Sequence, residues 1–316
     1  MWLWIVFLVA GFIGIIKGAD WLIDGSTSLA RKYHLSELTI GLTIVAFGTS
    51  APELVVSLFA SIGGHEQVLL GNVIGSNIFN LLLILGISGL ISPIPIQDKT
   101  IRNEIPYSVF AGILLLVLGN DSWFSSHENT LRWYDGIVLL SFFLLFLLYS
   151  YRNRRDNMAP DVPAAVYGSA KTFLLIFSGL ILLVVGGRLV VDNAVKLAYS
   201  LGVSEKLIGL TLIAGGTSLP ELAASAVAAW KKRSGLAIGN VIGSNIFNIL
   251  FILGSSVTIT SVPYPSSFNT DVFLYLIVSL MLLATMYTGV LKQFDRWEAA
   301  IFLILYAGYI TFLFMR

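Results

Sequence analysis

Two glutamates lie in segments whose other residues are almost all apolar or small. Glu53 stands in GTSAPELVVS (48–57) and Glu221 in GTSLPELAAS (216–225). In both segments a proline directly precedes the glutamate, and a threonine and a serine stand four and three positions before it. Carboxylate and hydroxyl oxygens are ligands that hard cations prefer, so each segment is a candidate cation site.

The backbone should be broken beside each glutamate. Pro52 has no N–H and cannot donate to the carbonyl of Gly48, so a helix through this segment loses a hydrogen bond. Thr49, Ser50 and Glu53 share one face of such a helix because they are three and four residues apart. We therefore expect a discontinuous helix whose carbonyls just before the break can bind a cation. The second copy repeats this set with Ala214, Gly216, Thr217, Ser218, Pro220 and Glu221.

A second polar motif, GNVIGSNIFN, follows each segment, at 71–80 and at 239–248. In the first copy Asn72, Ser76 and Asn80 are four residues apart and share a helix face, and the second copy places Asn240, Ser244 and Asn248 likewise. The chain has no cysteine, and its three histidines stand in loop-like stretches, so a transition-metal site is not expected. An all-oxygen set with two carboxylates suits Ca²⁺.

Structural roles are the alternatives for the same residues. Each glutamate could be protonated, or paired with Lys17 or Arg188, which also lie in apolar segments. Amides and hydroxyls often only join helices in membranes. Close helix packing is the expected role of the small-residue pairs 71/75 and 239/243, which are all glycines.

The two motifs belong to an internal repeat. Residues 71–86 and 239–254 are identical at 14 of 16 positions, and residues 40–54 recur at 208–222 with the same offset of 168. On our count of spans, five lie between a position and its copy. An odd number reverses the direction of the chain, so the copies should enter a membrane from opposite sides, as in many secondary transporters.

The composition places the chain in a lipid bilayer. Of its 316 residues 56% are hydrophobic and 12% charged, whereas soluble domains carry about 25% charged residues. We expect an all-α protein of ten transmembrane helices in two inverted repeats of five, with helices two, three, seven and eight discontinuous. The predicted spans are 2–29, 37–62, 67–91, 104–119, 133–150, 171–199, 205–230, 235–258, 271–287 and 296–314.

The loops predict orientation and organisation. With the N-terminus outside, inner loops hold 13 Lys and Arg residues and outer loops 4, so the positive-inside rule places both termini outside a cell membrane. The expected parts are an N-terminal repeat (1–150), a cytoplasmic linker (151–170) and a C-terminal repeat (171–316). The net charge of +1 gives no reason to expect nucleic acid, and no nucleotide-binding motif is present.

At its duplicated motifs the chain resembles the sodium/calcium exchanger family, in a compact prokaryotic form. The resemblance implies that Glu53, Glu221 and the carbonyls of Thr49 and Thr217 bind Ca²⁺. It implies Na⁺ ligands at Ala46, Thr49, Ser50, Glu53, Ser76, Ala214, Thr217, Ser218, Glu221 and Ser244, with Asn80 and Asn248 as flanking amides. Some relatives, including potassium-dependent ones, have Asp at the position of Asn248, so no K⁺ requirement is expected. It also implies that spans one and six are long, tilted helices that slide during transport.

The expected function is Na⁺/Ca²⁺ antiport by alternating access, without covalent chemistry, a cofactor or a necessary partner subunit. Proton/Ca²⁺ exchange in the same architecture is the nearest alternative, because carboxylates also bind protons. A passive cation channel would also use carboxylates in the membrane. Channels generally place their filter on an axis between subunits, whereas this repeat lies within one chain.

Overall fold

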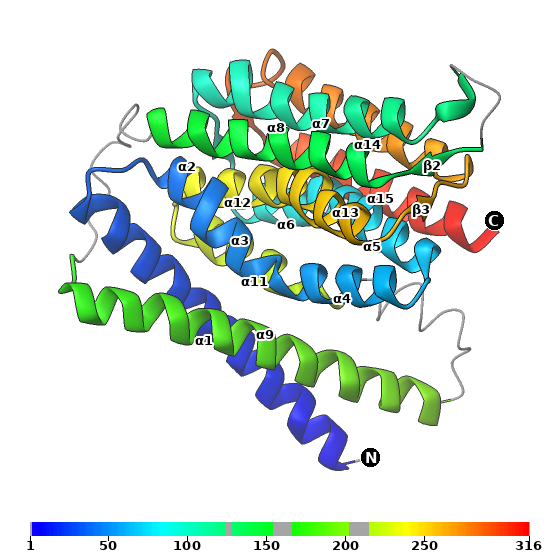
Figure 1. Cartoon of the computed structure of the whole chain (residues 1–316). Helices are drawn as coiled ribbons and strands as arrows, with labels where there is room; N and C mark the ends of the chain where they lie inside the picture. Colours follow the sequence, from blue (N-terminus) through cyan, green and yellow to red (C-terminus); the bar gives the residue numbers. More distant parts are fainter. Residues whose placement is uncertain (1, 124–127, 154–165, 202–214, 316) are drawn as a thin grey trace.

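A computed structural model describes residues 2–123, 128–153, 166–201 and 215–315. Nearly all of them are helical, and the helices lie in layers (Figure 1). One end of the molecule carries the close of α1 (Trp2–Lys32) and the start of α9 (Ser169–Ser200), and we call it the linker end. The other end, with both chain termini, is the terminal end; it lies to the right in Figure 1.

Helices α1 and α9 form a separate pair along the lower edge of Figure 1. They contain 31 and 32 residues, so at 1.5 Å per residue each is about 46–48 Å long, well beyond a hydrocarbon core of about 30 Å. They cross at glycines: a Cβ on Gly18 would stand 2.8 Å from the carbonyl oxygen of Gly179. The prediction that spans one and six are long is confirmed.

The second span is broken as predicted. It consists of α2 (Glu37–Ile40), the π-helical η1 (Gly41–Val45), α3 (Ala46–Thr49) and α4 (Ala51–Ile62). The two arms, 37–49 and 51–62, meet at an angle of 50°. Ser50 lies at the break with ψ of 7°, and Pro52 stands in the first turn of α4, where its missing N–H costs no hydrogen bond.

The third and eighth spans are less interrupted than expected. Each is helical over 26 residues, at 66–91 and 234–259. Their interruption is a π-helical segment, in which the hydrogen bonds reach one residue further than in an α-helix. The elements are α5 (Glu66–Phe79), η2 (Asn80–Ile84) and α6 (Leu85–Ile91), then α12 (Ser234–Ile246), η6 (Phe247–Leu253) and α13 (Gly254–Ile259).

The described helix of the seventh span, α11 (Leu219–Trp230), carries Glu221 and belongs to this centre. The remaining helices flank it: η3 (Thr100–Glu104), α7 (Ile105–Leu118), η4 (Asp121–Trp123), α8 (Trp133–Arg152), α14 (Phe268–Thr285) and α15 (Arg296–Met315). Two antiparallel strand pairs link the halves: β1 (Ile94–Pro95) with β4 (Gln293–Phe294), and β2 (Thr130–Leu131) with β3 (Val262–Pro263).

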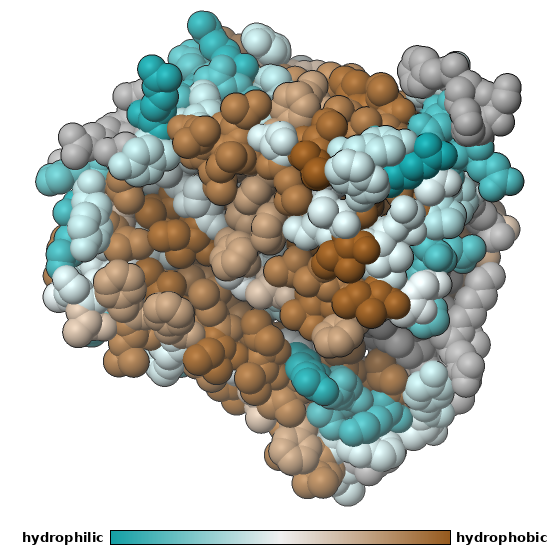
Figure 2. Space-filling model, viewed as in Figure 1, coloured by the Kyte–Doolittle hydropathy of each residue, from teal (hydrophilic) through white to brown (hydrophobic). Residues whose placement is uncertain are grey.

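Eight of the described helices are long and apolar enough to cross a membrane, and the bent pair of the second span makes nine. The remaining predicted span, 205–230, begins outside the described ranges. Its described part contains α11. Figure 2 shows apolar residues over much of the middle of one face, with hydrophilic residues gathered toward its margins. This is the surface of a multi-pass membrane protein.

Candidate cation-binding site

The two glutamates lie at the contact between the repeats, and each is held by the other half. Ser218 donates a hydrogen bond to Oε1 of Glu53 at 2.8 Å, and Ser50 donates to Oε1 of Glu221 at 2.8 Å. Both carboxylates are about 1% exposed. The sequence placed Ser50 on the same helix face as Glu53, but the break at Ser50 instead turns its hydroxyl to the opposite repeat.

The same serines connect to the third and eighth spans. The hydroxyls of Ser50 and Ser244 are 3.0 Å apart, and those of Ser218 and Ser76 are 3.1 Å apart. Four predicted serines and both glutamates therefore form two matching chains of hydrogen bonds. Their distances agree within 0.1 Å, which is the inverted symmetry that the 168-residue offset predicts.

The first asparagine of each motif copy, Asn72 or Asn240, bonds residues beside the helix break. The amide nitrogen of Asn240 donates to the backbone carbonyl of Glu221 at 3.2 Å and to Ser225 at 2.9 Å. Its oxygen lies 3.1 Å from the hydroxyl of Thr49. In the other half, Asn72 makes the matching contacts with Glu53, Ser57 and Thr217. These two amides join the broken helices, and their oxygens accept from the threonines.

Four buried oxygens at this centre have no hydrogen-bond partner among the described residues. They are Oε2 of Glu53, Oε2 of Glu221, Oδ1 of Asn80 and Oδ1 of Asn248. A buried oxygen without a donor is costly unless another positive group satisfies it. Carboxylate and amide oxygens fit hard cations, so the donor set matches the predicted kind of site.

The carbonyl of Ala46 keeps its helical hydrogen bond beside the first break. It accepts the N–H of Ser50 at 3.0 Å and lies 3.3 Å from the hydroxyl of Thr49. This is an ordinary i→i−4 bond that Pro52 does not affect, because its missing N–H would have bonded Gly48. One lone pair of the Ala46 oxygen is therefore used, and the second is left for a cation. Ala214, its counterpart, lies outside the described residues. Gly48 has a packing role as well, since a Cβ there would collide with Leu180 of α9.

The basic partners considered for the glutamates do not reach them. Arg188 lies 3.7 Å from Asp192 of its own helix, and its side chain is 83% exposed. Lys17 is exposed on α1. Among the described residues, the buried basic side chain is that of Arg233, which lies 3.2 Å from Glu37 at the linker end and not beside the glutamates. Pairing with Lys17 or Arg188 is therefore excluded as the reason for the glutamates.

Close packing is seen for one of the two glycine pairs. A Cβ on Gly239 would stand 2.8 Å from the carbonyl oxygen of Leu38, and one on Gly243 would stand 2.8 Å from Leu42, which confirms close packing there. The positions that the repeat places opposite Gly71 and Gly75 lie within 206–214, outside the described ranges. Close packing therefore stays a prediction for this pair.

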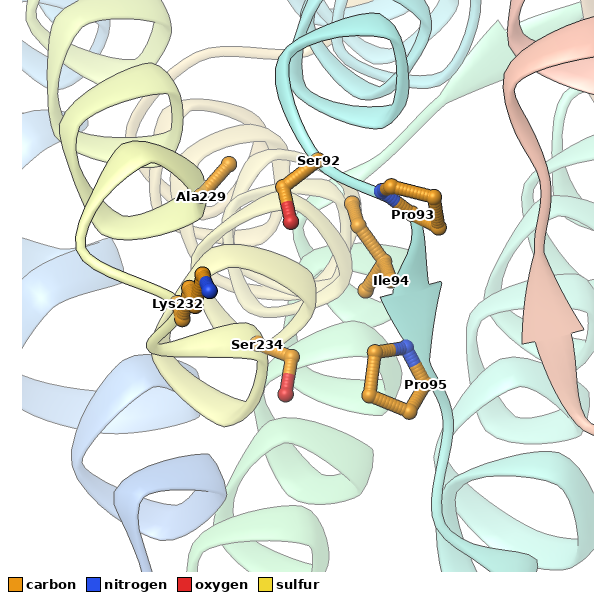
Figure 3. Close-up of a pocket in the computed structure, with 7 residues that line it drawn as sticks. All are labelled: Ser92, Pro93, Ile94, Pro95, Ala229, Lys232 and Ser234. Carbon is orange, nitrogen blue, oxygen red and sulfur yellow. The ribbon is translucent and has the colours of Figure 1, made fainter. Parts of the chain in front are cut away.

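Gly71 and Gly75 line a cavity of about 490 Å³. Its wall includes Asn72 and Thr217, so the cavity reaches the edge of the site from the terminal end. A smaller hollow of about 170 Å³ lies at the linker end, where β1 faces the close of α11 and the start of α12 (Figure 3). None of the predicted ligands is among the residues that line it.

Two site residues were missed by the sequence reasoning. Asn80 donates to Oδ1 of Asn245 at 2.9 Å, and Asn248 donates to Oδ1 of Asn77 at 2.9 Å. Asn77 and Asn245 follow Ser76 and Ser244 by one residue and so fall off the predicted helix face. Their presence in both copies of the motif was the available signal.

Comparison with known proteins identifies the family. A family model described as "Sodium/calcium exchanger protein" matches residues 3–152 and 171–315. The chain belongs to this family.

Several proteins resemble the chain over nearly its whole length. The putative antiporter CaxA of Alkalimonas amylolytica is 38% identical, with 98% of each chain covered. The sodium/calcium exchanger MaX1 of Methanosarcina acetivorans is 31% identical over 97% of each. Among solved structures, the sodium-calcium exchanger NCX_Mj superposes with a TM-score of 0.85 at 34% identity, over 98% of both chains. The family is one of transporters, and the structural match supports the predicted polytopic fold.

Proposed function

We propose that the protein is a secondary antiporter that exchanges Na⁺ for Ca²⁺ across the membrane by alternating access. The observation that carries this is the pair of buried glutamates, each bonded through one oxygen to a serine of the other repeat while its second oxygen has no described partner. Family membership and the exchanger relatives support the same function.

Charge explains why such a site exchanges ions. An ionised carboxylate in the middle of a membrane helix costs about 2.5–3.5 kcal/mol on insertion scales, and two of them repel. One Ca²⁺ neutralises the charge of −2, and so can several Na⁺. Because both cations compete for the same carboxylates, binding of one favours release of the other.

The proposed ligands follow the repeat. Glu53, Glu221 and the backbone carbonyls of Thr49 and Thr217 hold Ca²⁺. Na⁺ is held by the glutamates together with Ala46, Thr49, Ser50, Ser76, Ala214, Thr217, Ser218 and Ser244. Asn80 and Asn248 flank the centre, and because the latter is an amide rather than a carboxylate, transport should not require K⁺.

Packing at the linker end and a cavity toward the terminal end support alternating access. At the linker end, α12 packs tightly on the second span through Gly239 and Gly243. A cavity toward the terminal end is lined in part by Asn72 and Thr217. In the proposed cycle the two sides of the site open in turn, while α1 and α9 slide against the bundle.

For orientation we propose that the linker end is cytoplasmic and both termini lie outside the cell membrane, as the positive-inside rule indicates. The organisation that accompanies this is two repeats, 1–150 and 171–316, joined by a cytoplasmic linker at 151–170. The site is built within one chain, so a monomer is sufficient for transport.

The test is Ca²⁺ uptake into liposomes that contain the purified full chain. Three sets of vesicles carry an outward Na⁺ gradient, an outward H⁺ gradient at equal Na⁺, or no gradient. Uptake should occur with the Na⁺ gradient and not without a gradient, and added K⁺ should not change it. Uptake driven only by H⁺ would identify a proton/Ca²⁺ exchanger, and uptake with no gradient a channel; either result overturns the proposal.

A further inference from the structure

The amides of Asn80 and Asn248 could face the centre with either end. A cation binds the amide oxygen, whereas the NH₂ end carries partial positive charge and repels it. The orientation of each amide therefore decides whether it helps or hinders binding. Both side chains are about 1% exposed, so surrounding groups of the protein set that orientation.

For Asn248 the orientation follows from a backbone carbonyl. The amide nitrogen of Asn77 lies 3.2 Å from the backbone oxygen of Asn245, which can only accept a hydrogen bond. The oxygen of Asn77 must therefore face the other way, where Asn248 lies 2.9 Å distant. Because that oxygen also only accepts, Asn248 presents its NH₂ to Asn77. Its own oxygen is turned away and has no described partner.

The other half repeats this contact with one difference. Asn80 donates to the oxygen of Asn245 at 2.9 Å, and the oxygen of Asn80 has no described partner. The amide nitrogen of Asn245 has none either. The orientation of Asn80 thus depends on Asn245, but no backbone group among the described residues accepts from Asn245 as one accepts from Asn77.

The freed oxygens belong beside the glutamates. Asn80 is one helical turn from Ser76, which bonds Ser218 and through it Glu53. Asn248 stands in the same relation to Ser244. Residues four apart share a helix face, so each oxygen is on the side of its helix that carries the site.

We propose that Asn77 and Asn245 are positioning residues, which turn the amide oxygens of Asn248 and Asn80 toward the transported cation. They need not touch the ion themselves. Partners that orient the ligands of a metal commonly change its affinity by 10- to 100-fold when removed. This role rests on the proposed function, because it presumes that a cation occupies the centre.

The test uses double-mutant cycles in the liposome assay, with the half-saturating Ca²⁺ concentration as the readout. Asn77→Ala should raise that concentration about tenfold. Combined with Asn248→Ala, it should add nothing to the effect of Asn248→Ala alone, because Asn77 acts only through that amide. The same holds for Asn245→Ala with Asn80→Ala. Effects that multiply in both cycles would overturn the proposal.

A matched control is Asn193→Ala. Its amide is also buried, yet within the described part of the chain it donates only to the carbonyl of Leu189 in α9, at 2.7 Å. Half-saturation should not change in this variant. If it shifts as much as in Asn77→Ala, loss of any buried amide is enough, and the positioning role is contradicted.

A conservative pair keeps the proposal testable if the alanine variants fail to fold. Asn245→Asp retains the oxygen that accepts from Asn80 and removes only a nitrogen without a described partner, whereas Asn245→Leu removes the acceptor. The Asp variant should keep half-saturation at or below that of the unaltered protein, and the Leu variant should raise it about tenfold. The Asp side chain adds negative charge when ionised and still presents an acceptor oxygen to Asn80 when protonated, so a clearly raised value in Asn245→Asp would contradict the proposal.

The two inferences can fail separately. If the unaltered protein shows no Na⁺-driven uptake, the proposed function falls, and the positioning role falls with it. If the unaltered protein transports but Asn77→Ala leaves half-saturation unchanged, only the positioning role is wrong.

Discussion

The two halves of the chain agree at the centre of the molecule and differ at its ends. Around the glutamates, matching hydrogen bonds between the repeats have nearly the same lengths, such as 2.8 Å for both serine–glutamate contacts. At the ends, the turn after α4 reads GGH at 63–65, whereas the equivalent turn after α11 reads KKR at 231–233. The basic turn forms ion pairs with α1 and α2.

The centre and the ends of the molecule have different roles: one binds ions, and the other controls access. A centre that takes the same ions from either side must present the same ligands after the halves exchange roles, so both copies keep them. The ends need not be equal, because each controls access from a different side. We infer that charge at the linker end favours the packed arrangement seen there.

Removing either carboxylate should stop transport equally. Glu53→Gln and Glu221→Gln each leave one charge at the centre, which is too little to bind Ca²⁺ in competition with water. Na⁺-driven Ca²⁺ uptake should fall by at least about 100-fold in both, since lost charge–ligand contacts in a buried site are the most costly. Substantial uptake in one variant alone would show that the centre is not functionally symmetric.

Breaking the part-buried ion pair at the linker end should lower stability strongly. Arg233 is 8% exposed and lies 3.2 Å from Glu37. Arg233→Ala leaves the largely covered Glu37 without this partner, at a cost of up to about 3 kcal/mol. The measurement is thermal unfolding in detergent. His65 is the equivalent, exposed residue at the terminal end, and His65→Ala should change stability by no more than about 0.5 kcal/mol.

The glycine pairs offer a test of packing at the two ends. Gly239→Ala would place a methyl group 2.8 Å from the carbonyl of Leu38, which should destabilise the protein by about 1–3 kcal/mol. Gly71 is its counterpart in the repeat, and the 168-residue offset predicts a similar loss for Gly71→Ala. Equal destabilisation by both changes would mean that the terminal end is packed as tightly as the linker end.

The smallest effect is expected at Lys231. Its ammonium lies 2.7 Å from Asp20 and 2.6 Å from Asp24, but all three side chains are partly exposed. Lys231→Ala should lower stability by about 1 kcal/mol or less, and the difference should shrink in high salt. A larger loss that salt does not reduce would place this pair out of contact with water.

The sequence predicts the ligands better than their contacts. Glu53, Ser50 and their counterparts were found because the repeat duplicates polar residues that lipid does not require. Spacing along one helix could not show that Ser50 bonds Glu221, because that contact forms between halves. Asn77 was missed for a related reason: it lies one residue off the polar face and points to the neighbouring helix.

The sequence predicted the helix geometry only where a local residue signals it. Pro52 is a local signal, and the break beside it was predicted. The π-helical segments of the third and eighth spans begin at Asn80 and at Phe247. They lie in apolar runs, where the residue pattern does not distinguish a π-helix from an α-helix.

The reciprocal serine–glutamate bonds also bear on how the protein is made. Ser218, which holds Glu53, is synthesised 165 residues after it. At a synthesis rate of about 5–20 residues per second, Glu53 waits on the order of ten to thirty seconds for this partner. During that time the first half contains a broken helix whose carboxylate lacks its hydrogen-bond partner from the second half. Insertion should therefore depend on shelter for this segment until the second half arrives.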